Sequence, residues 1–374
     1  MKPMRKRIAI IGSGIAGSTC ASILADYHDV EIFESCDKSG ASRPLQMEGS
    51  IYYLENVPKL QPTYEVSRLI LSSENESSSF HGHLGYLYKI GGTEGVDVEV
   101  RKEVESRVKI HYSTKIKNLN ELSDWDYIVA ADGFRSKIAF IAGMRERDPE
   151  ITGLGLGLTV RGEFQPGVTL SLFDNNYAPG GYLYLIPIDK KTASLVSASI
   201  GNGFNARTLR YRLRNYADGL GLKIINEWTD MEKWYKFHSY QKNNVFVIGG
   251  AASFTDKTYG FGLKYSIESA KLCAEAIMKE RSYQNLLASL LEELKYWERI
   301  GSVLVNTTNK EKDMFIRLAS NPIVRRRIED GKSLRPFFNM LTRYLGIKYS
   351  ISSGLNSLRH KSPSLSIYQD LNKV

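Results

Sequence analysis

Residues 7–17 read Arg7-Ile8-Ala9-Ile10-Ile11-Gly12-Ser13-Gly14-Ile15-Ala16-Gly17. The short β-branched run at its start predicts a buried parallel strand. The glycine-rich turn that follows leads into Ser18–Tyr27, where the pattern predicts a helix with small residues on one face. A strand, a turn of the form G-x-G-x-x-G and a helix together are typical of a dinucleotide-binding unit.

Each glycine of the turn has a separate physical task. We expect Gly12 to allow the tight turn, Gly14 to let the backbone approach a pyrophosphate, and Gly17 to let helix and strand pack closely. The helix N-terminus then presents unpaired N–H groups and the positive end of the helix dipole to the phosphates. The predicted phosphate-binding residues are Gly12, Ser13, Gly14, Ile15, Ala16 and Gly17.

A second strand, Asp29–Phe33, ends at Glu34 and Ser35. We expect Glu34 to accept hydrogen bonds from the hydroxyl groups of an adenosine ribose. An acid at this position favours a free 2′-hydroxyl, and therefore FAD or NAD over NADP. The alternative is a glycine-rich turn in an α/β protein that binds no nucleotide.

Two later segments have the same character. Asp126–Ser136 is a predicted strand that runs into an Asp132-Gly133 turn, and Val245–Ala252 is a buried strand followed by small residues. The second of these continues through Gly260 and Gly262 into a helix, Leu263–Lys279. Close backbone approach before a helix N-terminus suits a ribityl chain, a pyrophosphate or a flavin carbonyl.

Three such segments, far apart in the sequence, predict a discontinuous binding domain. The predicted fold class is α/β, a Rossmann-type FAD-binding domain with an inserted, mostly antiparallel substrate-binding sheet and a C-terminal helical region. We place the first part of the FAD-binding domain at 1–150, the sheet at 151–236, the second part at 237–280 and the basic helical region at 281–374. Val108–Tyr112 and Lys115–Leu119 are predicted strands, and Arg43–Gly85 is predicted to form loops and short strands.

In these segments the chain resembles the geranylgeranyl reductase family of FAD-dependent oxidoreductases, within the aromatic-hydroxylase-like class. Ala130–Ser136 resembles that class's G-A-D-G-x-x-S, and Gly249–Gly262 resembles its G-D-A-A…P-x-x-G-x-G. Pro179–Pro187 is similar to the P-x-x-Y-x-W-x-F-P stretch of the narrower family, with Tyr184 for Trp and Ile186 for Phe. The resemblance spans about residues 7 to 280.

The resemblance implies FAD as cofactor and a prenyl lipid or another apolar small molecule as substrate. Reduced flavin would deliver hydride to a C=C bond of a geranylgeranyl-type chain, and an external donor, NAD(P)H or a ferredoxin-like protein, would supply the electrons. It also implies cofactor contacts at Arg43, Lys89, Ala131, Asp132, Gly133, Gly250, Gly262 and Leu263. Pro179, Tyr182, Tyr184 and Pro187 would line the substrate tunnel, although an aromatic edge strand that only packs in the core is the alternative.

Three positions depart from the family pattern. The ribityl-binding aspartate is replaced by Gly250, the K-P-C-G turn by Arg43-Pro44-Leu45-Gln46, and an arginine directed to the pyrophosphate by Lys89. Because the reactive cysteine is absent, we assign no catalytic residue. The open alternatives are a flavin-dependent monooxygenase or hydroxylase, and a non-catalytic flavin- or lipid-binding paralogue.

The composition agrees with a folded globular protein. Of 374 residues, 42% are apolar and 24% charged, which excludes collagen, disorder and low complexity. Three cysteines are too few and too scattered for a disulfide scaffold or a thiolate metal site, and the pair His81 and His83 has no evident third ligand. We therefore predict a cytoplasmic protein without a metal ion.

Positive charge is concentrated at the end of the chain. Residues 310–374 hold 13 Lys and Arg against 5 Asp and Glu, which is +8 of the chain's +9. Arg325-Arg326-Arg327, close to the apolar Pro336–Leu341, suits peripheral contact with a membrane surface. The alternative is a helix packed on the cofactor domain with its arginines in water. No signature of a nucleic-acid-binding module is present, so no nucleic-acid partner is predicted.

Overall fold

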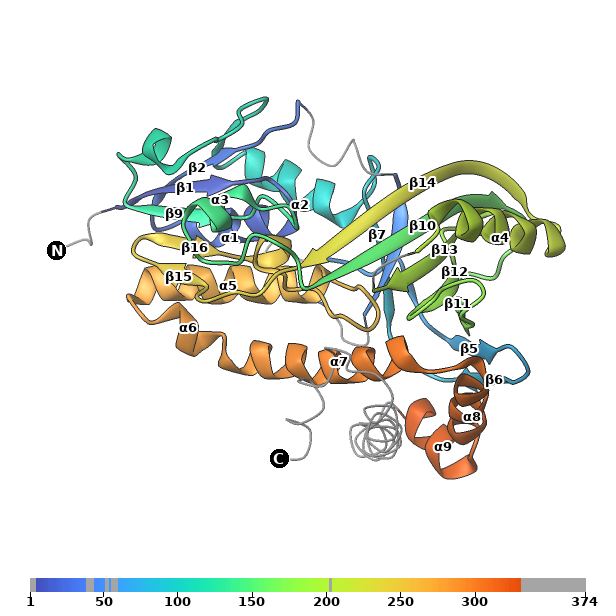
Figure 1. Ribbon diagram of the computed structural model, residues 1–374. Coiled ribbons are helices and arrows are strands. Elements are labelled where there is room, and N and C mark those ends of the chain that lie inside the picture. The colour runs from blue at the N-terminus through green and yellow to red at the C-terminus, as the bar shows by residue number, and fades with distance from the viewer. Residues whose placement is uncertain (1–4, 38–43, 51–53, 55–59, 202–203, 331–374) are drawn as a thin grey trace, which may run out of the picture.

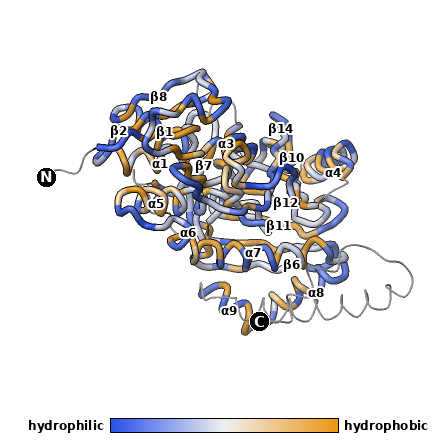
Figure 2. The backbone as a smooth tube through the Cα atoms, turned by 60° about the vertical axis from the view of Figure 1, so that its left-hand side comes forward, coloured by the Kyte–Doolittle hydropathy of each residue, from blue (hydrophilic) through white to orange (hydrophobic). Residues whose placement is uncertain are grey.

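The computed structural model describes residues 5–37, 44–50, 54, 60–201 and 204–330, so the predicted site residue Arg43 and the segment Pro336–Leu341 lie outside the described residues. Two lobes, each built on a sheet, lie side by side and are joined by the long strands β10 and β14 (Figure 1). Hydrophobic stretches follow the strands of the two sheets, whereas α4 and α7 alternate hydrophobic and hydrophilic residues (Figure 2).

The first lobe is a six-stranded, mostly parallel sheet in the order β15-β16-β9-β1-β2-β8. β1 pairs in parallel with β2 and with β9, so the carboxyl ends of these strands meet at one edge. Helices α1 and α5 pack against each other, and α1 also contacts α2. The elements are β1 (Arg7–Ile11), α1 (Ile15–Leu24), β2 (Asp29–Phe33), α2 (Val96–Glu105), β8 (Lys109–His111), β9 (Tyr127–Ala130), α3 (Lys137–Ile141), β15 (Gln241–Lys242), β16 (Val245–Val247) and α5 (Leu263–Lys279).

The core of this lobe includes the β-branched run of β1. Ile8 and Ile10 are fully buried and belong to the same cluster as Val129 and Val247 of the neighbouring strands. The predicted strand at 115–119 is wrong, because those residues lead without regular structure into a 3₁₀ helix, η1 (Leu119–Leu122). The Rossmann-type part of the predicted fold class is confirmed.

The second lobe is a seven-stranded sheet in the order β14-β10-β13-β12-β11-β5-β6. All of its neighbouring strands pair antiparallel except β5, which pairs in parallel with β11. α4 (Ala206–Gly219) covers the outer face, where Leu209 and Leu213 pack on Leu156 and Leu158 of β10. The strands are β5 (Arg68–Ser73), β6 (Ser77–His81), β10 (Ile151–Arg161), β11 (Val168–Phe173), β12 (Tyr182–Pro187), β13 (Thr192–Ile200) and β14 (Lys223–Trp234).

A small sheet in the order β3-β7-β4 completes the strand structure of the described residues. It consists of β3 (Gln46–Ser50), β4 (Tyr64–Glu65) and β7 (Tyr86–Ile90). A 3₁₀ helix, η2 (Gly249–Ala252), follows β16. The last described residues, 283–330, form helices, as predicted for the C-terminal region: α6 (Tyr283–Leu286), α7 (Ala288–Asn306), α8 (Asn309–Ala319) and α9 (Pro322–Glu329).

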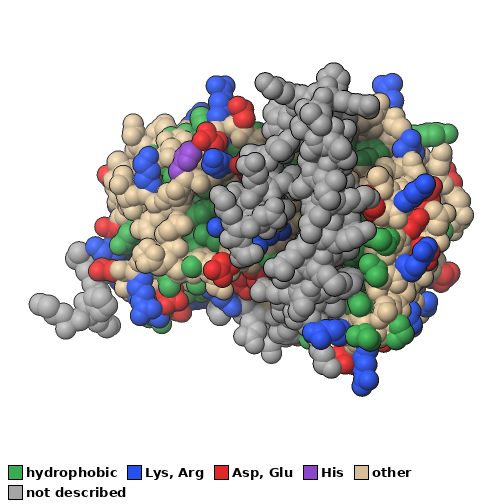
Figure 3. All heavy atoms as spheres, turned by 60° about the horizontal axis from the view of Figure 1, so that its bottom comes forward, with side chains coloured by type: hydrophobic (Ala, Val, Ile, Leu, Met, Phe, Trp, Pro, Cys, Tyr) green, Lys and Arg blue, Asp and Glu red, His purple; other side chains and the backbone are tan. Residues whose placement is uncertain are grey.

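The three consecutive arginines lie on α9. Arg325 donates a hydrogen bond to Ser78 (3.0 Å) and covers the ring of Phe80, so this arginine packs on β6. Positive and negative side chains are interspersed on the face that carries α7 to α9 (Figure 3). Within the described part of the chain, no helix is long and apolar enough to span a membrane.

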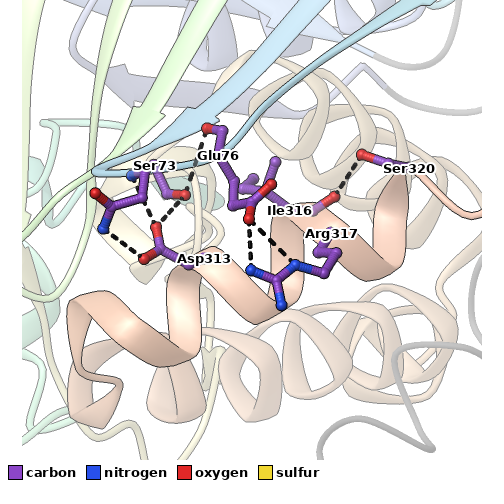
Figure 4. Close-up of polar contacts among 7 residues, drawn as sticks. Ser73, Glu76, Asp313, Ile316, Arg317 and Ser320 are labelled. Carbon is purple, nitrogen blue, oxygen red and sulfur yellow. Dashed lines mark hydrogen bonds and ion pairs between the residues drawn. The ribbon is translucent and has the colours of Figure 1, made fainter.

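Helix α8 is fixed to the β5–β6 hairpin by two charged side chains (Figure 4). Asp313 accepts hydrogen bonds from Ser73 Oγ (2.7 Å) and from the backbone N–H of Asn75 (3.1 Å). Arg317 pairs with Glu76 (2.5 Å) at the exposed end of the contact. Burial would raise the pKa of Asp313, but the hydrogen bonds from Asn75 and Ser73 lower it. Asp313 is therefore the anchor of this contact.

We expect Asp313→Ala to lower the free energy of unfolding by about 1–3 kcal/mol, because Ser73 and Asn75 lose a charged acceptor. Since the folded-state pKa of Asp313 is lowered, its contribution is present above about pH 4 and is lost as the pH falls further. Arg317→Ala is the control, because its ion pair is exposed and should matter little. Urea denaturation of both variants at pH 7 and pH 3.5 measures this, and equal effects at pH 7 would contradict it.

Candidate functional site

A cavity of about 830 Å³ lies between the carboxyl edge of the first sheet, the N-terminus of α5 and the inner face of the seven-stranded sheet. Residues from all three predicted dinucleotide segments and from the predicted tunnel strand line it. They are Gly12, Gly14, Ile15, Ala16, Glu34, Ser35, Ala131, Asp132, Gly133, Tyr184, Gly250, Gly262 and Leu263. The structure thus brings together segments that are more than 200 residues apart in the sequence.

The first glycine turn has the geometry expected from its spacing. Gly12 has φ +102°, and a Cβ there would lie 2.4 Å from the carbonyl oxygen of Ala131. A Cβ at Gly17 would lie 2.0 Å from the carbonyl oxygen of Gly12. At Gly14, which is the N-cap of α1, a Cβ would meet nothing within 4 Å, and no side chain caps the helix. The open end of α1 therefore faces the cavity with room for an anionic group.

Glu34 closes the second strand and faces the same turn. Its carboxylate accepts hydrogen bonds from the backbone N–H of Ser13 (2.8 Å), from Ser13 Oγ (2.9 Å) and from the N–H of Cys36 (2.9 Å). Burial would raise the pKa of Glu34, but the hydrogen bonds from Cys36 and Ser13 lower it. Glu34 is therefore ionised at neutral pH, and the buried Ser13 holds it in place.

Asp132 follows β9 and has one oxygen without a partner. Its Oδ2 accepts the N–H of Lys137 (2.9 Å), whereas Oδ1 is buried and has no hydrogen-bond partner among the described residues. Burial raises the pKa of Asp132, although the hydrogen bonds that its carboxylate accepts act to lower it. A buried acceptor that lines a cavity and lacks a donor fits a hydroxyl group of a ligand.

The loop between η2 and α5 is organised by Asp256, a residue that the sequence did not single out as a site. Its buried carboxylate accepts the N–H groups of Thr258 (2.9 Å), Tyr259 (2.5 Å) and Phe261 (3.2 Å). Burial raises the pKa of Asp256 to about 6 despite these bonds. The carboxylate thereby sets the path of the backbone up to Gly262, where α5 begins.

The N-terminus of α5 already has an acceptor. Glu48 of β3 accepts the N–H of Gly262 (2.8 Å) and of Leu263 (2.6 Å) through its Oε1. Gly262 provides no side chain of its own to cap the helix. Glu48 lies 214 positions before Gly262, so only a tertiary contact could reveal it.

Four predicted residues, Lys89, Pro179, Tyr182 and Pro187, do not line the cavity. The ammonium group of Lys89 pairs with Glu94 (2.8 Å), and Pro179 and Pro187 do not border the cavity. Tyr182 is buried and donates its hydroxyl to the carbonyl oxygen of Tyr259 (3.0 Å). Of the four predicted tunnel residues, Tyr184 alone lines the cavity. Within the described residues, no group of three His, Cys, Asp or Glu side chains could hold a metal ion.

Comparison with known proteins adds to this geometry. Residues 10–52 match a family described as an NAD(P)-binding Rossmann-like domain. The chain is 24% identical over 217 residues to the digeranylgeranylglycerophospholipid reductase of Methanosarcina acetivorans, covering 55% of this chain and 51% of that protein. The chain thus spans about half the length of this curated relative.

Solved structures share nearly the whole fold. A geranylgeranyl bacteriochlorophyll reductase-like protein of Thermoplasma acidophilum superposes with a TM-score of 0.70 at 17% identity, covering 91% of this chain and 99% of that chain. The p-nitrophenol 4-monooxygenase of Pseudomonas putida superposes with a TM-score of 0.65 at 15% identity, covering 88% and 97%.

The fold therefore places the chain in a structural class that includes a reductase-like protein and a monooxygenase. Within that class, the resemblance to the geranylgeranyl reductase group is confirmed.

We expect Glu48→Ala to lower the free energy of unfolding by about 1 kcal/mol, because two N–H groups at the start of α5 lose their acceptor. Glu48→Gln is the matched variant, since it keeps an acceptor oxygen, and it should cost less. Thermal denaturation of the two variants beside the native protein measures the difference. A Glu48→Ala protein as stable as the native one would show that the cap contributes nothing.

Proposed function

We propose that this chain is an FAD-dependent oxidoreductase that reduces C=C bonds of a prenyl-type substrate. The observation that carries the proposal is the single cavity, which joins the open N-terminus of α1 to the inner face of the second sheet. The named relatives support the direction of the chemistry, because one is called a digeranylgeranylglycerophospholipid reductase and another is reductase-like. An external donor, NAD(P)H or a ferredoxin-like protein, would supply the electrons.

The residues present fit FAD at three points. The open space at Gly14 and the uncapped end of α1 would receive the pyrophosphate. The ionised Glu34 would accept from ribose hydroxyls, and the unpaired Asp132 Oδ1 would take a further hydroxyl donor. Bound FAD would supply hydride transfer, and the protein would supply orientation and exclusion of water.

The inner face of the second sheet would hold the substrate opposite the cofactor. Tyr184 from β12 and Trp228 from β14 line the cavity there, and aromatic rings provide large apolar surfaces for an isoprenoid chain. We assign no proton donor, because Leu45 stands where the family carries its cysteine.

A flavin-dependent monooxygenase is the second candidate function. Two observations favour it. Leu45 stands where the reductase family carries its cysteine, and the chain shares its fold with a p-nitrophenol 4-monooxygenase. NAD(P)H-dependent oxygen consumption that yields a hydroxylated product would select this function, whereas saturation of the chain without oxygen uptake would select the reductase.

The first experiment is the visible absorbance spectrum of the purified full chain, followed by identification of any flavin released on denaturation. A yellow protein that releases FAD supports the proposal and permits reductase assays on prenyl lipids. A colourless protein that also fails to bind added FAD would refute both flavoenzyme functions and leave a protein that has kept the fold for another role.

We expect Gly14→Ser to weaken FAD binding by at least tenfold without loss of stability. The added side chain would stand in the open space beside the helix end, whereas Ser is a good N-cap residue, so the free energy of unfolding should change by less than about 0.5 kcal/mol. Gly219→Ser in α4 is the matched control, because a Cβ there also meets nothing within 4 Å and lies outside the cavity lining. Fluorescence titration of the apoprotein measures the affinity, and unchanged affinity in Gly14→Ser would contradict the pyrophosphate assignment.

A further inference from the structure

We propose that the cavity limits the length of the apolar chain that it accepts, and that Trp228 sets this limit. The inference rests on the proposed function and deepens it, because it narrows the substrate class to slender isoprenoid chains of limited length. It depends on the register of the second sheet, which places small residues before a row of large ones.

The second sheet presents its inner side chains to the cavity in rows across the strands, because directly opposite residues of an antiparallel pair share a face. Successive rows are about 6.8 Å apart along the strands. Gly153, Gly155 and Gly157 of β10 belong to three consecutive rows. In the same order, these rows include Ile200, Ala198 and Val196 of β13 and Glu232, Asp230 and Trp228 of β14.

The second row forms a low floor in the cavity. Gly155 and Ala198 lie side by side there, and both line the cavity. A Cβ at Gly155 would lie 3.7 Å from the nearest atoms of Asp230, which is ordinary contact, and Asp230 already has interactions of its own. The bulky neighbours on β10, Leu156 and Leu158, belong to the outer core that α4 covers. The inner side of β10 therefore leaves room for a chain.

The third row closes the cavity. Val196 is opposite Gly157 on one side and Tyr184 on the other, so Trp228, Val196 and Tyr184 share this row, which we call the end wall. All three line the cavity, whereas Gly157 does not, because a Cβ at Gly157 would lie 2.1 Å from the indole ring of Trp228. The residues of the next row lie outside the lining: Thr159, Ser194 and Ile186.

Trp228 contributes to the end wall through the volume of its ring. It is 9% exposed, and its Nε1 has no hydrogen-bond partner among the described residues. The other tryptophan of β14, Trp234, differs, because its Nε1 donates to the carbonyl oxygen of Thr255 (3.0 Å). The Trp228 ring thus covers the β10 backbone at Gly157 by packing, and a smaller side chain would extend the cavity by one row.

A closed end makes affinity depend on chain length. Each methylene group that a chain buries adds favourable free energy until the chain reaches the end wall. A longer chain has to leave its further carbon atoms outside or crowd the wall, and overpacking is unfavourable. From the first row to the third the strands rise about 14 Å, which is shorter than an extended geranylgeranyl chain. We therefore expect affinity to stop rising before that length.

Three alcohols that grow by one isoprene unit at a time test the proposal: geraniol, farnesol and geranylgeraniol. Isothermal titration calorimetry on the purified full chain with FAD present should find farnesol and geranylgeraniol bound with affinities within about threefold of each other. Trp228→Ala should make geranylgeraniol bind at least tenfold more tightly than farnesol, because the chain then reaches the space over Gly157. Gly155→Val should weaken both by at least tenfold, because its side chain stands on the floor.

Thr229→Val is the matched control. Thr229 follows Trp228 on β14, but it is opposite Leu156 and therefore on the outer face, outside the cavity lining. Its hydroxyl accepts a hydrogen bond from Arg210 (2.7 Å) on α4. This variant should bind all three alcohols as the native protein does.

The proposal is overturned if the native protein binds none of the alcohols, or if its affinity still rises tenfold from farnesol to geranylgeraniol. It is also overturned if folded Trp228→Ala keeps the native ratio of these two affinities. Should Trp228→Ala fail to fold, Gly155→Val decides, because a Cβ at Gly155 meets no close contact and the strand accepts a β-branched residue. Native affinities in Gly155→Val would refute the length limit.

The two proposals fail separately, because the length limit is measured by binding and the reductase by saturation of a C=C bond. A protein that shows the limit and its shift in Trp228→Ala, but saturates no prenyl chain, refutes the reductase and supports the length limit. A protein that saturates prenyl chains, yet binds each longer alcohol more tightly, does the reverse.

Discussion

The backbone contact at the carboxyl end of β1 is the constraint on which the rest of the site depends. The space beside Gly12 is taken by the carbonyl group of Ala131, and the space beside Gly17 by the carbonyl group of Gly12. No side chain fits between these segments, so β1, β9 and α1 are held at backbone distance. This contact aims the end of α1 at the cavity, and it leaves Gly14 as the open position of the turn.

The loop between η2 and α5 forms another wall of the cavity, and it packs against helix α7. A Cβ at Gly301 of α7 would lie 2.6 Å from the carbonyl oxygen of Lys257, and Thr258 Oγ1 donates to the carbonyl oxygen of Trp297 (2.6 Å). The loop held by Asp256 is thus clamped between its own hydrogen bonds and α7. A helix outside the predicted cofactor domain therefore fixes the backbone from which α5 begins, and with it one wall of the cavity.

The sequence predicted what local patterns can encode. The β1 turn, the end of β2 and the start of α5 each carry their own glycines or acid, and the structure brings all three to one cavity. Contacts between distant segments left no local signal: β5 pairs with β11 across about 100 residues, and Glu48 caps α5. The resemblance predicts that Lys89 contacts the cofactor. In the structure the ammonium group of Lys89 instead pairs with Glu94, five residues away. Arg43 lies outside the described residues, so its assignment stays a prediction.

The cavity joins two chemically different walls. The first lobe offers the open end of α1 and a mixed set of charged side chains, whereas the sheet offers the aromatic rings of Tyr184 and Trp228. The charged side chains are Glu34, Asp97, Lys115, Asp132, Arg135 and Lys137. A molecule with phosphates at one end and an uncharged ring at the other is therefore best accommodated with its phosphates at the open end of α1, where unpaired backbone N–H groups face the cavity and Gly14 leaves room.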